Sequence, residues 1–245
     1  MHIVPSYVVN SKIDSLYIPY IWDDTRAGDD FTFDPQIFLD NFSHISLHGK
    51  YALGIGIYEW IVWRYNKISE KSEVVFYIAE AEWCASISPL YVEYIELNRK
   101  EYLGPVDGPL WCAATMVSSM TEYGPDEDED CDACIAYLIQ LAMHVLPDTK
   151  IFEQWLDAAI KRLMKDYPQQ EEDPFENLFE EDKEERKGPL VAREALDPSF
   201  DYHPDQAPRL LDQFLRSVDY KNNPFLRSPE ELMELGIEHP YRLLP

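Results

Sequence analysis

The sequence predicts an all-α protein, built as a multi-helix bundle or as a solenoid-like stack of helical hairpins. Apolar residues recur at helical spacing in one segment after another through a core at residues 34–166. Residues that begin or end helices, such as Asp34-Pro35 and Gly124-Pro125, separate those segments. The AVILMFWYC set makes up 46% of the chain and aromatic residues 13%, which suffices for a sizeable core in one domain over residues 1–245.

The core is predicted to start with one amphipathic helix and one buried helix. Asp34 is a suitable N-cap for the first helix, and Gly49 can close its C-terminus. Residues 50–69 are apolar on almost every side, which is typical of a helix in the middle of a protein. Two glycines near its start, Gly54 and Gly56, leave a strand as the competing interpretation.

The rest of the core is predicted to hold helices that a turn divides into two blocks. The turn is the segment 104–109, which is rich in glycine and proline. Asp148 is a suitable cap for the last helix, whose final turns carry basic residues that suit the helix dipole. The helices predicted on either side of the turn cover residues 73–86, 90–98, 110–123, 126–145 and 148–166.

The two flanks of the core differ from it in composition. Residues 1–33 are expected to form an irregular or extended lead-in. Residues 167–190 form an acidic segment, since positions 166–187 hold ten acids and three bases. Residues 191–245 are proline-rich and are expected to wrap over the helical body, with short helices near 210–218 and 230–235.

The charge of the chain excludes some classes of partner. Asp and Glu number 46 against 21 Lys and Arg, so the formal net charge is −25 and the pI is near 4.4. Such a chain repels nucleic acids and anionic membranes at neutral pH, and direct binding to either is not expected. The excess is larger in residues 123–245, with 29 acids and 13 bases, than in residues 1–122, with 17 and 8. A protein with a basic surface is the expected partner.

The sequence shows no pattern typical of export or of crossing a bilayer. The N-terminus has no basic stretch followed by an uninterrupted apolar one, as a secretory signal would have. The most apolar run, residues 51–63, is 13 residues long and contains Glu59, whereas a bilayer span needs about 20 residues. The four cysteines lack the spacing of a disulfide framework. A cytoplasmic location is therefore expected.

An acidic run before one of the later helices is the first candidate for partner binding. Acids suit a helix N-terminus, and a solvated loop is the plain alternative, but six acids in seven positions repel each other and exceed that role. A calcium loop starting at Asp126 would need glycine and glutamate where Cys131 and Tyr137 stand. The candidate partner-binding residues of this run are Asp126, Glu127, Asp128, Glu129, Asp130 and Asp132.

The second candidate for partner binding lies in the irregular lead-in, at Trp22, Asp23 and Asp24. Tyr17 and Tyr20 precede these residues, and further acids follow them. Aromatic side chains rimmed by acids are typical of protein-binding surfaces, because the rings supply anchors and the charges steer the encounter. Covering the core is the alternative role for Trp22, as expected for the five tryptophans inside predicted helices.

The sequence contains no pattern typical of a metal site, a redox site or a cofactor-binding site. Asp40, His44 and His48 share one face of the predicted helix, but they span about 12 Å along it, which is too far for one ion. Cys131 and Cys134 lack two further zinc ligands nearby and are expected to be buried thiols. No phosphate-binding loop, dinucleotide fingerprint or nucleophile motif is present. We therefore expect no catalytic residue, no metal ligand and no cofactor.

Trp60 and Trp63 form a W-x-x-W pair in a helical pattern, and acidic runs lie at 126–132 and 171–185. With these features and no catalytic motif, the chain resembles bacterial immunity proteins of the polymorphic-toxin or type VI secretion class. The resemblance implies a cytoplasmic inhibitor of one cognate toxin, and a nuclease is the expected kind because its active-site groove is electropositive. A metal-dependent enzyme with a site of scattered carboxylates and a helical adaptor protein are the alternatives.

Overall fold

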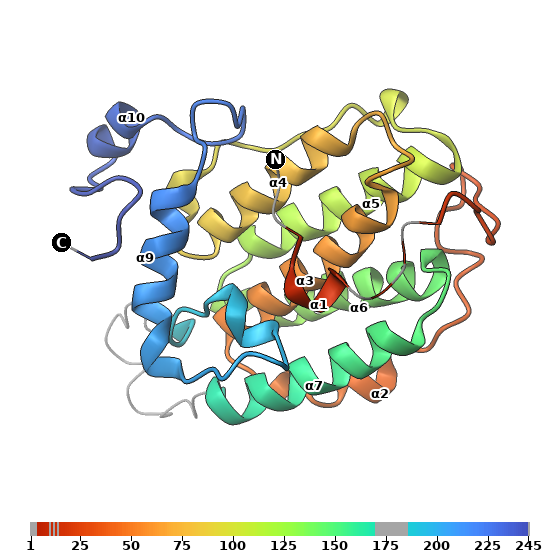
Figure 1. Ribbon diagram of the computed structural model, residues 1–245, viewed down its shortest axis with the longest axis horizontal. Coiled ribbons are helices and arrows are strands. Elements are labelled where there is room, and N and C mark those ends of the chain that lie inside the picture. The colour runs from red at the N-terminus through yellow and green to blue at the C-terminus, as the bar shows by residue number, and fades with distance from the viewer. Residues whose placement is uncertain (1–3, 10, 12, 14, 170–185, 245) are drawn as a thin grey trace.

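The computed structural model is an all-α bundle in the residues that it describes, which are 4–9, 11, 13, 15–169 and 186–244. The longest buried helix, α3, runs through the middle of the bundle and contacts α4, α5, α6 and α7 (Figure 1). This arrangement around one central helix is a bundle rather than a stack of hairpins. The α-helices are α1 (Ser6–Val9), α2 (Gln36–Leu39), α3 (Leu47–Tyr65), α4 (Ser72–Ala85), α5 (Gly104–Glu122), α6 (Asp128–Val145), α7 (Lys150–Asp166), α9 (Ala207–Ser217) and α10 (Pro229–Glu234).

The buried helix predicted after residue 50 is confirmed as α3. Its side chains are buried on all sides, and those of Ile57 and Trp60 are fully inaccessible to solvent. The two glycines stand inside the helix, so the strand interpretation is wrong. A Cβ at Gly54 would collide with Met120 of α5, and one at Gly56 would collide with Leu196. These glycines therefore allow neighbouring segments to approach α3 closely.

The prediction of a single helix from Asp34 to Gly49 is wrong, because the helical conformation is interrupted at Ile45. Only the short α2 and a 3₁₀ turn at Phe42–His44 form before the break. Ile45 is extended and makes an isolated β-bridge with Pro168. Ser46 then caps α3 by accepting a hydrogen bond from the N–H of Gly49 over 3.4 Å, which places this glycine in the first turn of the next helix.

The helix predicted at 90–98 is also wrong. A 3₁₀ turn forms at Pro89–Tyr91, and the chain then continues in extended form as far as Asn98. Val92 makes an isolated β-bridge with Leu226, and the N–H of Glu93 donates to the carbonyl of Phe225 over 3.0 Å. The distant C-terminal residues thus supply hydrogen bonds that a helix would otherwise supply locally.

The turn predicted at 104–109 is instead the beginning of α5. Pro105 fits the first turn of a helix, where its missing N–H is not needed. Pro109 lies further inside and cannot donate to the carbonyl of Pro105. The hydroxyl of Tyr20 donates to that carbonyl instead, so the N-terminal segment satisfies the group that the proline leaves open.

The remaining predicted helices are confirmed with small shifts at their ends. The predictions at 73–86, 126–145 and 148–166 correspond to α4, α6 and α7, and the helical part of 110–123 belongs to α5. The N-cap of α7 is Thr149 rather than the predicted Asp148, which lies one residue earlier and accepts from the N–H of Lys150 over 3.0 Å. The described residues of the lead-in are irregular apart from the single turn of α1.

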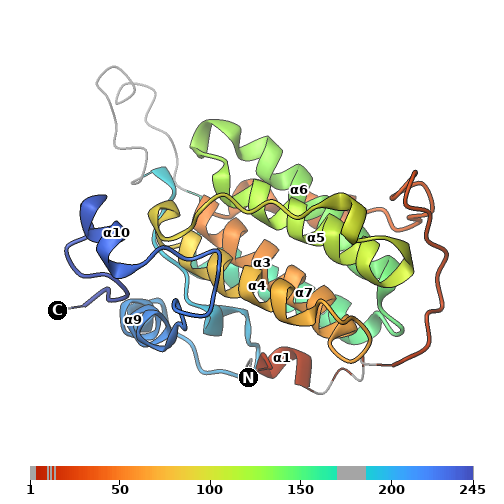
Figure 2. The same cartoon turned by 90° about the horizontal axis from the view of Figure 1, so that it is seen from above.

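The C-terminal segment crosses one end of the bundle, as Figures 1 and 2 show, with α9 against the bundle and α10 beyond it. These two helices match the predictions at 210–218 and 230–235. Leu215, Leu232 and Tyr241 form a second small core with Cys84 of α4. Most of the acidic segment predicted at 167–190 lies outside the described residues, since 170–185 are not among them.

Candidate partner-binding surface

The structure separates the nine candidate residues into two groups at opposite ends of α6. Asp128 and Asp132 lie in the first turns of this helix. Near its other end, Nε2 of His144 donates a hydrogen bond to the carbonyl of Ile21 over 2.8 Å. Trp22, Asp23 and Asp24 follow directly, so about 24 Å of helix separates them from Asp128. The two groups therefore do not form one compact cluster.

At the start of α6, a buried lysine forms ion pairs with two of the acids. The side chain of Lys50 is fully buried, and its Nζ lies 2.6 Å from Asp128 Oδ2 and 2.8 Å from Asp132 Oδ1. Both carboxylates keep about a third of their side-chain surface exposed, at 34% and 28%. Burial raises the pKa of Asp132, against the opposing effect of the Lys50 charge. The acidic run thus supplies the counter-charges of a lysine buried at the start of the apolar helix α3.

The other acids of this run divide between helix capping and solvent. A carboxylate oxygen of Glu127 accepts from the N–H of Gly124 over 3.0 Å. Asp126 pairs with Nη1 of Arg186 at 2.8 Å. Glu129 and Asp130 are exposed and make no hydrogen bond or ion pair with any residue the structure describes. These two carboxylates are the part of the run that a partner can reach without displacing an internal contact.

Trp22 and Asp24 lie at the beginning of α5 and are used by the fold. Nε1 of Trp22 donates to Asp24 Oδ1 over 2.9 Å, and the indole packs so closely on the helix that a Cβ at Gly108 would collide with it. The other Asp24 oxygen accepts from the N–H of Gly104 over 2.8 Å, which caps α5. Nη2 of Arg99 approaches the same carboxylate at 3.5 Å. Both side chains are half-buried, with their polar atoms engaged inside the molecule.

Asp23 organises the neighbouring turn. Its carboxylate accepts from the N–H of Thr25 over 2.9 Å and from the Thr25 hydroxyl over 2.7 Å. It also pairs with Nε of Arg26 at 3.1 Å. These hydrogen bonds, those from Thr25 first, hold the pKa of Asp23 below its ordinary value. Asp23 keeps 40% of its side chain exposed and remains available to a partner at this end of the molecule.

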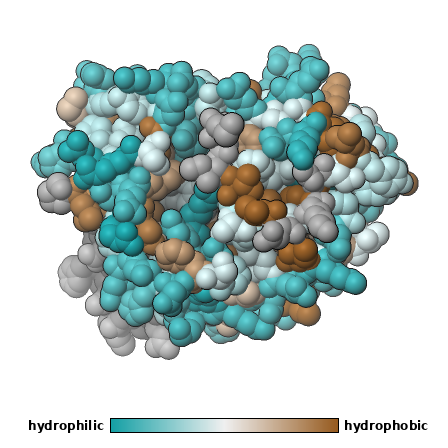
Figure 3. Space-filling view, viewed as in Figure 1, coloured by the Kyte–Doolittle hydropathy of each residue, from teal (hydrophilic) through white to brown (hydrophobic). Residues whose placement is uncertain are grey.

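Three large apolar side chains beside this group are exposed. Leu16, Tyr17 and Ile21 keep 73%, 72% and 71% of their surfaces accessible. We call these three residues the N-terminal apolar face. Tyr17 stands among the aromatic residues noted in the lead-in, whereas nothing in the local sequence pattern distinguishes Leu16 and Ile21 from core residues. Figure 3 shows hydrophobic residues at the centre and right of the face on which α1 lies, separated by hydrophilic ones.

The backbone that carries the N-terminal apolar face is fixed from inside. The side chain of Arg64 is fully buried in α3, and its Nη2 donates to the carbonyl of Tyr17 over 2.6 Å. The same guanidinium donates to the carbonyl of Ser15, and its Nε donates to Val145 at the end of α6 over 3.2 Å. With His144 holding the carbonyl of Ile21, the carbonyls point inward and the apolar side chains point outward.

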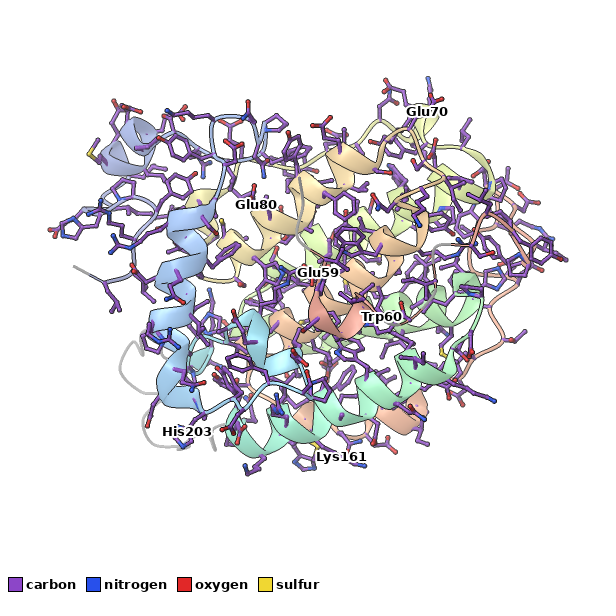
Figure 4. The ribbon with its side chains drawn as sticks, in the orientation of Figure 1. Glu59, Trp60, Glu70, Glu80, Lys161 and His203 are labelled. Carbon is purple, nitrogen blue, oxygen red and sulfur yellow. The ribbon has the colours of Figure 1, made fainter. Side chains whose placement is uncertain are left out.

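A buried carboxylate, that of Glu59 of α3, joins four segments of the chain near the middle of the molecule (Figure 4). Its carboxylate lies 2.5 Å from Nη2 of Arg193 and accepts from the indole N–H of Trp83 over 3.2 Å. The hydroxyl of Tyr7 donates to it as well. With an arginine, a tyrosine and a tryptophan as partners, Glu59 links α1, α4 and the 3₁₀ turn at Arg193–Leu196 to the central helix.

The other chemical candidates of the sequence are separated or buried. Asp40, His44 and His48 do not share one helix, because the helical conformation is interrupted at Ile45. Cys131 and Cys134 are free and buried as expected, and burial raises the pKa of Cys134 to about 11. Among the described residues, no group of three or more His, Cys, Asp or Glu side chains is arranged to hold a metal ion.

Comparisons with known proteins leave the surface to be interpreted from its own geometry. No protein-family model, no curated protein and no solved structure matches the chain. Within the part of the chain that the structure describes, no helix combines the length and the apolarity needed to cross a membrane.

Proposed function

We propose that this protein is a cytoplasmic immunity protein that binds and neutralises a cognate toxin with a basic surface, a nuclease being the expected kind. The observation that carries the proposal is the N-terminal apolar face, Leu16, Tyr17 and Ile21, held in solvent by a fixed backbone. We propose these three residues as the anchor in place of Trp22, because the indole N–H of Trp22 is engaged by Asp24 inside the molecule.

The energetics of the apolar face favour binding. Burying a large apolar side chain contributes about 1.5–3 kcal/mol, so three such side chains can dominate an interface. Ordering a loop on binding normally offsets part of this gain. Here Arg64 and His144 already hold the backbone, so little of the gain is lost to ordering.

The charges around the apolar face favour a basic partner. Residues 15–34 hold five acids and one base, Arg26, which lies near three of those acids. Charges further than a Debye length, about 8 Å at physiological ionic strength, are largely screened, so these local acids steer a partner more effectively than distant ones. A nuclease presents the complementary surface, because its groove must hold a polyanion.

The test is a titration of the purified protein against the product of the neighbouring gene, together with co-expression of the two in a bacterial host. The wild type is expected to bind below 1 μM, an order of magnitude typical of specific complexes, and to restore growth. The variant Leu16→Ser/Tyr17→Ser/Ile21→Ser is expected to bind at least about 100-fold more weakly. An adaptor would bind without restoring growth.

The matched control is Met233→Ser/Leu235→Ser, which removes two apolar side chains that are also exposed, at 53% and 46%, in the distant α10 and at its C-cap. It is expected to bind as the wild type does. Thermal unfolding of each variant checks that the fold is intact. The absence of a complex at micromolar concentrations, or equal binding by the triple variant, would contradict the proposal.

A further inference from the structure

Two adjoining hollows lie on a different part of the molecule, along α5 and beneath the extended segment after Tyr91. We call the smaller one, which Glu82 lines and which has a volume of about 230 Å³, the inner hollow. We call the larger one, which Arg99 lines and which has a volume of about 660 Å³, the outer hollow. Tyr94, Ile95, Ser118 and Glu122 line both. Figure 2 shows the extended segment passing along α5. Neither hollow includes a residue of the N-terminal apolar face or of the acidic run.

The inner hollow contains a buried carboxyl group with no cationic partner among the described residues. Glu82 of α4 is 1% exposed. Its two oxygens accept hydrogen bonds from Ser118 over 2.7 Å and from Thr121 over 2.6 Å, both on α5. Other acidic residues in the described core, such as Glu59 and Asp132, pair with a base at close range. Burying a carboxylate without a counter-ion is costly, so this group needs an explanation.

The charged surroundings of Glu82 are negative. Glu93 of the extended segment and Glu122 of α5 line the same hollow. Tyr58 of α3 and Cys84 of α4 are the other titratable groups that interact with Glu82. Burial, partly opposed by the two hydroxyl donors and reinforced by Glu122, raises the pKa of Glu82 to about 7. A cation entering the hollow would offset the burial cost and the repulsion together.

We propose that the inner hollow binds an alkyl ammonium or guanidinium group, with Glu82 as its buried counter-ion. The remaining walls, formed by Ala85, Pro89, Val92 and Ile95, are apolar and suit an alkyl stem. Two bases, Arg99 and Lys100, line the outer hollow and do not line the inner one. There the Arg99 guanidinium already lies over the ring of Trp111, 4.7 Å from its centroid.

The extended segment favours a lysine or arginine side chain carried on a peptide as the source of this cation. From Tyr94 to Asn98 the backbone N–H groups meet no acceptor among the residues described. Such an extended edge can pair with a second extended chain. Tyr94, 75% exposed at the mouth of both hollows, offers a ring to that chain. A free amine is the other source of the same chemistry.

The first experiment measures the binding of n-butylammonium by NMR, with the neutral n-pentanol as the control ligand. The expected dissociation constant is about 1 mM, which is ordinary for a fragment of this size. Since the ligand binds the ionised form of Glu82, affinity should rise about tenfold from pH 6 to pH 8. Shifts should centre on Ser118 and Thr121, and n-pentanol should bind more weakly and without pH dependence.

The variant Glu82→Gln keeps the size of the side chain and is expected to bind at least about tenfold more weakly at pH 8, with no pH dependence. Glu73→Gln removes the same charge from an exposed position of α4 and serves as the control. Wild-type affinity in Glu82→Gln, or a wild-type affinity equal at pH 6 and pH 8, overturns the proposal even if the variant folds poorly.

The second experiment separates the two sources. The probe is the capped peptide Ac-Val-Lys-Val-NH₂, compared with n-butylammonium in the same assay. Tighter binding of the peptide, with slower hydrogen exchange at Tyr94 to Asn98, identifies a peptide as the source. Tighter binding of the amine, with no change in exchange, identifies a free amine. Binding of neither compound at about 10 mM overturns the proposal.

Discussion

The start and the end of α6 use their neighbours in opposite ways. At the start, the acids that make the sequence conspicuous are largely taken up by Lys50, Arg186 and the cap at Gly124. At the end, Arg64 and His144 donate hydrogen bonds to backbone carbonyls and leave apolar side chains in solvent. Charge density along the chain therefore says less about a binding surface than the way in which each polar group is already satisfied.

The largest expected effect concerns the start of α6. Lys50→Met should destabilise the protein by about 3 kcal/mol, because it leaves two partly buried carboxylates together without their cation. Urea unfolding measures the change. Lys161→Met, which removes an exposed lysine 2.7 Å from Asp157, should cost less than about 0.5 kcal/mol. Equal losses in the two variants would show that Lys50 does not organise this end of the helix.

In contrast to the acids paired with Lys50, the buried carboxyl of Glu82 has no base beside it among the described residues, and its ionisation should make the unfolding free energy depend on pH. The folded-state pKa of Glu82, about 7, lies above its ordinary value of 4.5. Its favourable contribution is therefore complete below pH 4.5 and is lost as the pH rises to about 7. The unfolding free energy of the wild type, relative to Glu82→Gln, should fall by about 3 kcal/mol over this interval. A constant difference would refute the buried, unpaired state.

At the other end of α6, Tyr17→Ala should weaken partner binding by about 2 kcal/mol, or about 30-fold, because it removes one exposed anchor. The change should appear mainly as faster dissociation in surface plasmon resonance. Thermal stability should stay within about 0.5 kcal/mol of the wild type, since the side chain contacts mostly solvent. A marked loss of stability would indicate a core role.

The smallest effect belongs to the two solvent-facing acids of the run. Glu129→Lys/Asp130→Lys should slow association by about threefold at low salt and reduce its salt dependence, while dissociation changes little. These positions are better suited to the test than Asp128, whose reversal would place a second cation beside Lys50. An association rate that ignores both the charges and the salt would remove the steering argument.

Helices were predictable from the sequence where their signals are local. The capped segments α6 and α7 and the apolar α3 follow from spacing and end residues. The helix predictions were wrong where a distant segment pairs with the backbone. Pro168 forms a β-bridge with Ile45, and Leu226 forms one with Val92. These pairings, like the use of Tyr20 at Pro105, have no local trace in the sequence.

Part of the surroundings of the candidate residues was predictable in the same sense. Asp126 to Asp132 lie at a helix start, as the sequence predicts, while their role in partner binding stays a prediction. Which of the acids and of the lead-in residues remain exposed depends on Lys50 and Arg64, two buried bases of α3. The choice between an inward and an outward side chain at Leu16 and Ile21 follows from those tertiary contacts.

Glu59 has a consequence for the way the molecule comes apart. One carboxylate on the central helix holds both Tyr7 of α1 and Arg193, which stands at the beginning of the C-terminal segment 191–245. Loss of that segment would leave this acid without its base and loosen α1, only a few residues before the N-terminal apolar face. Removal of the C-terminal segment is therefore expected to be felt at α1, and the two segments should unfold as one cooperative unit.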